Sequence, residues 1–452
     1  MPVQISLIGP FRVSVDDRPV PDASWVRKDA AGLVKVLALS SARRLHREQV
    51  VDLLWPDLTL DEAAPRLHKA AHYARRATGR ADAIVLRHEM VSLFPDEAVE
   101  VDVPAFEAAA ASALAEGSPA AAEKVLEAFA GEPLPDDLYA EWAGEVRERC
   151  AALRSRLVDL ARAPSYERGR LEQQIRFCRT RDGVTLAYAT SGTGPPLVKA
   201  ANWLTHIDHD WRSPVWRHWL LELSRRHRLV RYDERGCGLS DWDVESADFE
   251  SWVTDLETVV DEAGLDRFPL LGISQGAAVA VVYAARHPGR VTRMVLYGSY
   301  PQGRLVRARD EADRRVHEVQ VELARLGWGT DSPAFRQVFT SEFMPEGSRE
   351  LWDAFNELQR SSTSPENAAR VLSVTGGVDV TAEARQVRAP TLVLHARGDQ
   401  RPPFEQGRLM ASLIPDSRFV ALESVNHILL ADEPAWQVFL GEVETFLAED
   451  CD

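Results

Sequence analysis

The sequence predicts a multidomain chain: an α+β domain, then a short all-α domain, then an α/β domain whose parallel sheet carries a helical cap. Its length of 452 residues exceeds what one ordinary hydrophobic core organises. Along the chain, short strands and amphipathic helices give way to an alanine-rich stretch and then to alternating strands and helices. We therefore expect domains at residues 1–102, 103–162 and 174–452, with a linker at 163–173.

The first domain begins with a strand-like segment, QISLIGPFRVSV, that closes on a turn at Asp16–Pro19. Two short amphipathic helices are predicted around the basic stretch RRLHR, residues 43–47, and a third over Asp61–Thr78. Two β-like pieces, AIVLRHEMVSLF and AVEVDV, follow and are expected to form a hairpin. Strands, three helices and a hairpin wing in this order predict a winged helix-turn-helix.

The second domain is alanine-rich and is predicted to form three helices, of which the last runs from about Asp137 to Ala161. Breaks near residues 117–119 and 131–135 separate them, because glycine and proline interrupt helices there. Helices of this length suit a helical-repeat domain. Pro164 and Gly169 mark the segment that we expect to be the linker.

The third domain alternates strands with helices, which is typical of a parallel sheet covered on both faces. Some ninety residues of charged, helical character, about 301–388, interrupt the alternation and are expected to form a cap over the sheet. Eight strands are predicted, at residues 174–179, 185–190, 197–200, 228–232, 268–273, 293–297, 391–395 and 418–422.

Composition narrows the class of protein. Charged residues interrupt every apolar stretch, and MPVQISLIGPFRV lacks the basic start of a signal peptide, so we expect a soluble cytoplasmic protein without a membrane segment. The four cysteines lack CxxC spacing, and no metal or cofactor is expected. The net charge is −16, yet residues 27–87 hold twelve basic and seven acidic residues, so the acidic excess lies mostly in the other domains.

The sequence GISQG, residues 272–276, is the strongest chemical signal. It follows the apolar strand FPLLGI and precedes the helical run AAVAVVYAARHP, the context that makes GxSxG a nucleophile elbow. Glycines at 272 and 276 let backbone pass backbone in so tight a turn. Ser274 would then stand at the carboxyl edge of the sheet, at a helix N-terminus that favours developing negative charge.

A serine hydroxyl is a weak nucleophile and needs a base with an orienting carboxylate, in the chain order Ser, acid, His in this fold class. Asp399 follows the strand TLVLHA, and His427 follows the strand RFVALES, so both stand at strand ends in that order. We predict a catalytic triad of Ser274, Asp399 and His427. His287 and His395 are expected to lie out of reach, whereas His206 stays open as a pocket residue.

The oxyanion hole would use the backbone N–H of Gln275 and one from the loop Ala201–Trp203, with Trp203 as the candidate. Aromatic side chains before and within the cap suggest an apolar acyl pocket. They are Trp203, Trp211, Trp216, Trp328, Phe335, Phe339 and Phe343.

With the segment DERGCGLS, residues 233–240, these features resemble the α/β-hydrolase superfamily over about 280 residues. The family usually has His-Gly where this chain has Ala201-Asn202, which affects the path of the loop that carries the second oxyanion donor. Related epoxide hydrolases and dehalogenases use a carboxylate nucleophile at the position of Ser274. The serine therefore favours acyl transfer on an ester, thioester or lactone.

The segments LIGPFRV, RRLHREQVVDLLWPD, AAPRLHKAAHYARRATG and VEVDVPAFEAAA together resemble the SARP family of regulators over about 160 residues. The resemblance implies a winged-helix DNA-binding domain followed by a bacterial transcriptional activator domain, here shortened to about 60 residues. The helix 61–78 would contain the DNA-recognition helix, and Arg87 would approach the backbone from the wing. The side chains expected to face DNA on that helix are His68, Lys69, His72, Arg75 and Arg76.

The leading hypothesis is a serine hydrolase fused to a DNA-binding regulator, which couples a small acyl ligand to transcription. Modest DNA affinity is expected unless the protein is a homodimer, because the basic excess is small. One alternative is an ordinary esterase whose front half is only a scaffold or an oligomerisation module. Another is a ligand-sensing regulator on a hydrolase fold without catalysis.

Overall fold

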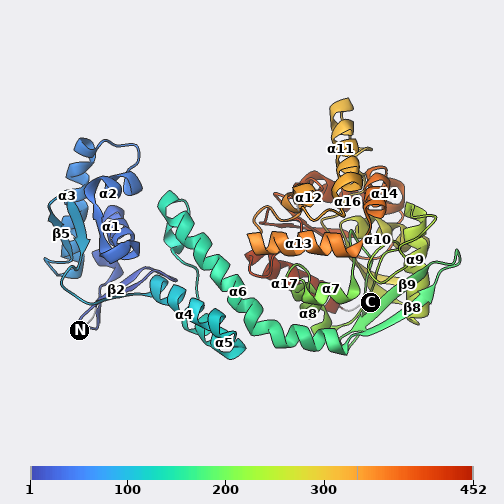
Figure 1. Cartoon of the computed structure of the whole chain (residues 1–452), viewed down its shortest axis with the longest axis horizontal. Coiled ribbons are helices and arrows are strands. Elements are labelled where there is room, and N and C mark those ends of the chain that lie inside the picture. The colour runs from blue at the N-terminus through green and yellow to red at the C-terminus, as the bar shows by residue number, and fades with distance from the viewer. Residues whose placement is uncertain (1–2, 333, 450–452) are drawn as a thin grey trace. The chain divides into compact units, whose positions relative to one another are not determined.

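The computed structural model describes residues 3–332 and 334–449, which divide between residues 163 and 164 into two compact units (Figure 1). Each unit has its own hydrophobic cluster. Among the described residues, no helix is long and apolar enough to cross a membrane.

The N-terminal unit opens with a sheet of order β3-β2-β1-β7. Its strands are β1 (Val3–Ser6), β2 (Arg12–Val15), β3 (Arg18–Pro19) and β7 (Val99–Val101). Asp16 and Asp17, both at positive φ, form the tight turn between β2 and β3 at the place that the sequence predicted. Strand β1 pairs antiparallel with β2 and parallel with β7.

Three helices follow: α1 (Lys28–Leu39), α2 (Arg47–Leu54) and α3 (Leu60–Thr78). Thr59 and Glu62 form a capping box at the start of α3, and its buried side is made of alanines and Leu67. The basic stretch between the first two helices forms a strand, β4 (Arg44–His46), that pairs with β6.

The two strands of the hairpin come from other segments than the sequence predicted. The first β-like piece alone supplies both of its strands, β5 (Ile84–Arg87) and β6 (Met90–Leu93), because His88 and Glu89 adopt positive φ and form a two-residue turn. The second piece becomes β7 and joins the other sheet, where Val99 and Val101 pair with β1. The expected pairing of the two pieces is therefore wrong.

Helices α4 (Asp102–Glu116), α5 (Pro119–Ala128) and α6 (Glu141–Glu172) come next, and short 3₁₀ turns lie at Asp22–Ser24, Ser41–Arg43 and Pro135–Asp137. Side chains from α1 to α6 share one apolar cluster. Asp102 accepts hydrogen bonds from the backbone N–H groups of Leu7 and Ile8 at 2.8 and 3.0 Å. The two segments that we predicted as separate domains thus share one core.

Helix α6 continues to Glu172 through the segment that we predicted to be a linker. Pro164 removes one helical hydrogen bond, which is why proline and glycine suggested a break. Tertiary contacts override this preference, because Tyr166 is buried and Gly169 lies against the indole of Trp211.

The C-terminal unit contains an eight-stranded sheet of order β15-β14-β13-β12-β10-β11-β9-β8. The eight strands predicted from the sequence are all present. They are β8 (Gln174–Arg179), β9 (Thr185–Ser191), β10 (Pro196–Lys199), β11 (Arg228–Tyr232), β12 (Phe268–Ile273), β13 (Val291–Tyr297), β14 (Thr391–Ala396) and β15 (Ser417–Leu422). Strands β10 to β15 pair in parallel, and β9 runs antiparallel to both of its neighbours.

Helices pack against the strands of this sheet, among them α8 against β11 and α17 against β14 and β15. Helices α8 and α17 meet through Trp219 and Trp436, whose ring centroids lie 4.7 Å apart, and α9 packs against α10. The sheet-covering helices are α7 (Ile207–Arg212), α8 (Arg217–Arg226), α9 (Phe249–Glu262), α10 (Gln275–Arg286), α15 (Thr381–Ala384), α16 (Phe404–Leu413) and α17 (Pro434–Ala448).

Where the sequence predicted a cap, the described residues form α11 (Glu311–Gly327), α12 (Ala334–Phe343), α13 (Arg349–Ser362) and α14 (Pro365–Gly376), and the short helix α15 follows before β14. The far end of α11 projects away from the other cap helices (Figure 1). The cap is tied to the sheet's loops, since Phe343 O accepts the backbone N–H of His427 at 2.8 Å.

Candidate active site

Ser274 lies in a strained turn between β12 and α10, with φ 52° and ψ −121°. A Cβ at Gly272 would lie 2.6 Å from Ala277 Cα, and one at Gly276 would lie 2.5 Å from Ala201 O. Both positions therefore require glycine, as the sequence argument held. The Ser274 N–H donates to Tyr297 O at 2.9 Å, which fixes the turn against the end of β13.

Asp399 and His427 are in direct contact. The Nδ1–H of His427 donates to Asp399 Oδ2 at 2.6 Å, and both side chains are buried. Asp399 Oδ1 also accepts the backbone N–H of Arg401 at 2.8 Å. This arrangement fixes the tautomer of the imidazole and leaves its Nε2 as the nitrogen able to accept a proton.

The ring of His427 lies at the same sheet edge as Ser274. It stacks on Tyr297, the residue whose carbonyl accepts the Ser274 N–H, and a Cβ at Gly298 would come within 2.7 Å of its Cε1. His427 Nε2 is buried and has no hydrogen-bond partner within the part of the chain that the structure describes. The strand ends of β12, β14 and β15 thus bring a serine, an acid and a base to one region.

The predicted oxyanion donors border the same hollow as the serine. Gln275 is the first residue of α10, so its backbone N–H has no carbonyl to bond within the helix. Trp203 lies in the loop after β10 and faces that hollow too. Where the family usually has His-Gly, Asn202 Oδ1 accepts a hydrogen bond from Lys199 Nζ, and burial lowers the pKa of this lysine to about 8. The sequence argument missed this support.

The other histidines have different partners. His287 Nε2 pairs with Glu257 at 2.8 Å at the far end of α10, and His206 accepts the backbone N–H of His209 at 3.3 Å as the cap of α7. His395 is buried in β14, where its Nε2–H donates to Pro402 O at 3.0 Å and lies 3.6 Å from Asp399 Oδ2. It packs beside the acid, and burial lowers its pKa.

The apolar pocket predicted from aromatic residues is only partly present. Trp203 and Phe343 border the hollow beside Ser274, which has a cavity volume of about 50 Å³. Trp211, Trp328 and Phe339 are buried in the core instead. Trp216 lines a separate hollow, and Phe335 packs on Gly327.

Polar and cationic side chains line much of the hollow, where the sequence predicted aromatic rings. Arg304, Arg307 and Arg401 line the hollow, together with His317 and Gln320. The sequence argument missed all five, because they come from the irregular start of the cap, from α11 and from the loop after β14, with no shared periodicity.

The loop after β11 is hydrogen-bonded to the turn that carries Ser274. Glu234 Oε1 accepts a hydrogen bond from Gln275 Nε2 at 2.8 Å, and burial raises the pKa of Glu234 to about 8. Burial likewise raises the pKa of Asp233 to about 7, although its carboxylate accepts the N–H groups of Ile207 and Leu239. Near pH 7 Glu234 is thus largely neutral, which suits its buried position next to the residue after Ser274.

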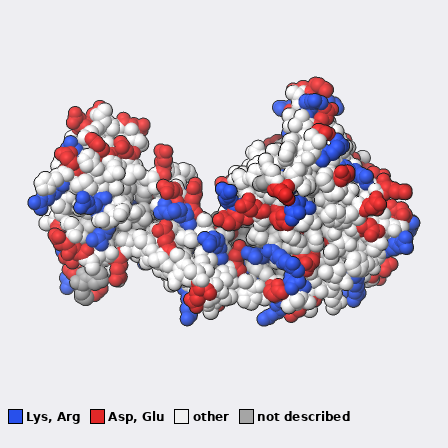
Figure 2. All heavy atoms as spheres, in the orientation of Figure 1, with Lys and Arg blue, Asp and Glu red and all other residues white. Residues whose placement is uncertain are grey.

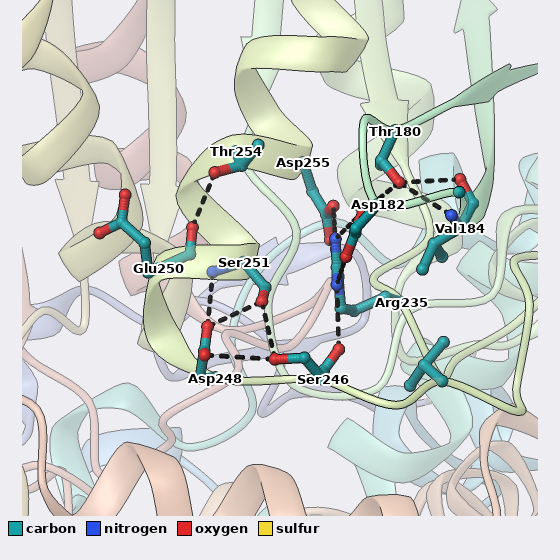
Figure 3. A network of polar contacts seen from close by, with 12 residues as sticks. Thr180, Asp182, Val184, Arg235, Ser246, Asp248, Glu250, Ser251, Thr254 and Asp255 are labelled. Carbon is teal, nitrogen blue, oxygen red and sulfur yellow. Dashed lines mark hydrogen bonds and ion pairs between the residues drawn. The ribbon is translucent and has the colours of Figure 1, made fainter.

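Arg235 anchors that loop to the rest of the unit (Figure 3). Its buried guanidinium donates to Asp255 at 2.8 and 2.6 Å, to Asp182 at 2.7 Å and to Ser246 O at 2.9 Å. Because Asp255 is buried as well, removing the arginine would leave a carboxylate without its counter-charge. Burial raises the pKa of Asp255 to about 6 even with the arginine present.

The residues predicted to face DNA lie on α3 and the hairpin. His68, Lys69, His72 and Arg76 are exposed along one side of α3, and Arg87 is exposed at the end of β5. Arg75 is different: it is half-buried, and its Nε–H donates to Ile84 O at 2.8 Å. Figure 2 shows acidic and basic side chains interspersed over the viewed face, so a large field of one sign is absent there.

Comparison with known proteins supports the interpretation of the C-terminal unit. Residues 211–434 match the family model described as "alpha/beta hydrolase fold". The chain is 26% identical over 270 residues to pyrrolizixenacetamide deacetylase of Xenorhabdus hominickii, covering 59% of this chain and 95% of the relative. It is 28% identical over 243 residues to the pimeloyl-[acyl-carrier protein] methyl ester esterase of Nitrosomonas europaea, covering 53% and 90%.

Among solved structures, an esterase from Rhodococcus sp. ECU1013 matches with a TM-score of 0.51 and 26% identity, over 61% of this chain and 98% of the esterase. An esterase from Exiguobacterium antarcticum matches with a TM-score of 0.53 and 21% identity, over 61% of this chain and all of the esterase, and shows the fold. The C-terminal part of the chain therefore has the alpha/beta hydrolase fold. These comparisons give no support for the SARP-type N-terminal region, which stays a prediction.

Proposed function

We propose that the C-terminal unit is a serine hydrolase that cleaves a carboxylic ester, thioester or lactone through Ser274, Asp399 and His427. The observation that carries the proposal is the 2.6 Å hydrogen bond between Asp399 and His427, with the second imidazole nitrogen unpartnered among the described residues. The relatives include a deacetylase and a methyl ester esterase, and the structural matches include esterases, which supports acyl hydrolysis.

In the proposed mechanism, His427 Nε2 takes the proton of Ser274 Oγ as that oxygen attacks the acyl carbonyl. The backbone N–H groups of Gln275 and Trp203 stabilise the resulting oxyanion. Collapse of the tetrahedral intermediate expels the alcohol or thiol, which takes the proton from His427. Water, deprotonated by His427, then releases the acid and restores the Ser274 hydroxyl. Asp399 orients the imidazole and stabilises its charged form.

The test is hydrolysis of 4-nitrophenyl butyrate by the full chain and by Ser274→Ala. Ser412→Ala is the matched control, because Ser412 is exposed on α16. We expect Ser274→Ala to lose activity by at least about 10³-fold and the control to keep it. Equal rates for wild type and Ser274→Ala would contradict the proposal. If the wild-type protein binds 4-nitrophenyl butyrate but does not hydrolyse it, the ligand-sensing alternative is favoured.

We also propose that the N-terminal unit binds DNA, so that an acyl ligand of the hydrolase unit is coupled to transcription. The specific observation is the exposed row of His68, Lys69, His72 and Arg76 on α3, which is preceded by two helices and followed by a hairpin. A helix with this placement fits the major groove. The modest basic excess suggests that a homodimer would be needed for tight binding.

The DNA test is fluorescence anisotropy of the full chain with promoter fragments. Lys69→Ala/Arg76→Ala removes two exposed charges from α3, and Arg12→Ala/Arg18→Ala removes two exposed charges from β2 and β3. We expect the α3 pair to weaken binding and to reduce the slope of log K against log salt by about 2, whereas the control pair leaves both unchanged. Equal effects of the two pairs would count against recognition through α3, and undetectable binding would favour the scaffold alternative.

A further inference from the structure

Three guanidinium groups border the hollow that contains Ser274. Arg304 and Arg307 precede α11 at the start of the cap, and Arg401 follows β14 two residues after Asp399. All three are half-buried, and the same three arginines also line a second, adjoining hollow. The positive charge therefore extends from the serine's surroundings into neighbouring space.

Only part of this charge is neutralised. Arg401 Nη1 pairs with Glu342 Oε2 at 2.7 Å. Arg304 Nη1 donates to the neutral amide of Gln320 at 3.0 Å, and Arg307 Nη1 donates to Gln302 O at 2.9 Å. Among residues 3–332 and 334–449, neither Arg304 nor Arg307 has a carboxylate within 4.0 Å. Three arginines thus line the hollow, one of them paired with a carboxylate, while Asp399 and Asp313 act on Arg307 and Arg304 from farther away.

Glu342 is itself shared between two partners, because its Oε1 accepts a hydrogen bond from Gln320 Nε2 at 2.8 Å. The amide of Gln320 therefore lies between Glu342 and Arg304 and bonds both. Cationic side chains that are partly removed from water and lack a counter-charge are costly. Such an arrangement is explained when an anionic ligand supplies the missing charge.

The pKa values of two groups that line the hollow, His317 and Arg307, are lowered. Burial, followed by Arg304, Arg401 and Arg307, lowers the pKa of His317 to about 4, so its imidazole is neutral near pH 7. Burial, with Arg304 and Arg401 contributing, lowers the pKa of Arg307 to about 10. This arginine stays protonated under ordinary conditions.

We propose that the hollow binds a carboxylate carried by the ester substrate, with Arg307 and Arg304 as its principal partners and the ester carbonyl at Ser274. A planar guanidinium matches a carboxylate through paired N–H donors. This inference rests on the proposed serine hydrolase function and names its substrate class. The carboxylate belongs either to the acyl group, as in a half-ester of a dicarboxylic acid, or to the leaving group.

The kinetic test uses two pairs of esters. Mono-4-nitrophenyl glutarate carries the carboxylate on the acyl side, and 4-(butanoyloxy)benzoate carries it on the leaving group. Each is compared with its neutral methyl ester. We expect wild type to prefer at least one carboxylate ester over its methyl ester by about tenfold or more in kcat/KM, the range of a charged hydrogen bond. The preferred pair identifies the side on which the carboxylate lies.

Arg307→Gln should lower this preference about tenfold, and Arg307→Lys should recover part of it. Arg315→Gln on α11 is the matched control, because it removes the same charge from a side chain that is 73% exposed. It should leave the preference unchanged. Wild type that hydrolyses both members of each pair at equal kcat/KM would overturn the inference, as would an equal loss of preference in the control.

A binding measurement separates this inference from the catalytic proposal. Calorimetric titration of Ser274→Ala with glutarate requires no turnover, and we expect Arg307→Gln in that background to weaken the affinity about tenfold. Arg307-dependent glutarate binding without hydrolysis of any ester would sustain the anion site and contradict the hydrolase. Hydrolysis of neutral esters without glutarate binding or carboxylate preference would sustain the hydrolase and contradict the anion site.

Discussion

The loops at the sheet edge of the C-terminal unit and helix α3 of the N-terminal unit carry their charged side chains in opposite ways. At the sheet edge of the C-terminal unit, Arg235, Asp255, Glu234 and Asp399 are buried and each has defined partners. In the N-terminal unit the cationic row of α3 is exposed. A buried charge fixes geometry, so its loss changes stability and chemistry together. An exposed charge changes mainly the binding of charged partners and its dependence on salt.

The largest effect is expected at the buried acid. Asp399→Asn removes the acceptor that orients His427, so kcat for 4-nitrophenyl butyrate should fall by about 10³- to 10⁴-fold. The melting temperature should change little, because the amide keeps the shape of the carboxylate. A variant with more than a tenth of wild-type kcat would show that Asp399 is not the orienting group.

Arg235 tests how strongly the unit depends on buried pairs. Arg235→Met leaves Asp255 without its partner and should lower the free energy of unfolding by about 3–5 kcal/mol, measured with urea. Arg286→Met is the matched control, because its pair with Glu250 lies at the surface, with side chains 41% and 61% exposed. It should cost less than about 1 kcal/mol. Similar costs for the two variants would remove the contrast between buried and exposed charge.

Buried Glu234 is expected to make the free energy of unfolding depend on pH. Its pKa in the folded protein, about 8, is above the ordinary value of 4.5, so the unfolded chain releases this proton first as pH rises. Ionisation therefore destabilises the fold progressively between about pH 4.5 and 8, and the cost is constant above that range.

Glu234→Gln should remove this cost. Relative to wild type, the variant should gain a few kcal/mol in free energy of unfolding between pH 5 and pH 8. The measurement is urea denaturation of both proteins at both pH values. A difference that stays constant with pH would contradict the raised pKa.

The smallest effect separates neighbouring arginines of α3. Arg75→Ala breaks the hydrogen bond to Ile84 O and should cost about 1 kcal/mol of stability. Arg76→Ala removes an exposed side chain and should change stability by less than about 0.5 kcal/mol. Urea denaturation of both variants measures these changes in the free energy of unfolding. Equal losses would mean that the hydrogen bond of Arg75 contributes nothing to stability.

Local patterns were sufficient to predict the sheet and the triad candidates. Each strand of the C-terminal unit is a short apolar run, and Ser274, Asp399 and His427 each follow one directly. Parallel strands bring their carboxyl ends to one edge, so linear order indicated spatial neighbourhood. Asp399 and His427 are indeed in contact.

The lining of the hollow could not be predicted in the same way. Arg304 and Arg307 lie in an irregular segment, and the position of such a segment over the sheet depends on cap packing rather than on periodicity. Aromatic residues suggested an apolar pocket, but Trp328 and Phe339 are buried against each other and against Trp203 and do not line the hollow. The hairpin prediction failed for a related reason, since Val99 and Val101 pair with a strand almost a hundred residues away.

The most direct test of the central claim is covalent labelling of the full chain with an alkyl fluorophosphonate, followed by peptide mass spectrometry. We expect a single modification at Ser274, which is lost in Asp399→Asn and His427→Ala because the hydroxyl then lacks its activated base. Ser412→Ala should label like wild type. Modification at another serine, or none at Ser274 in the wild-type protein, would contradict the account.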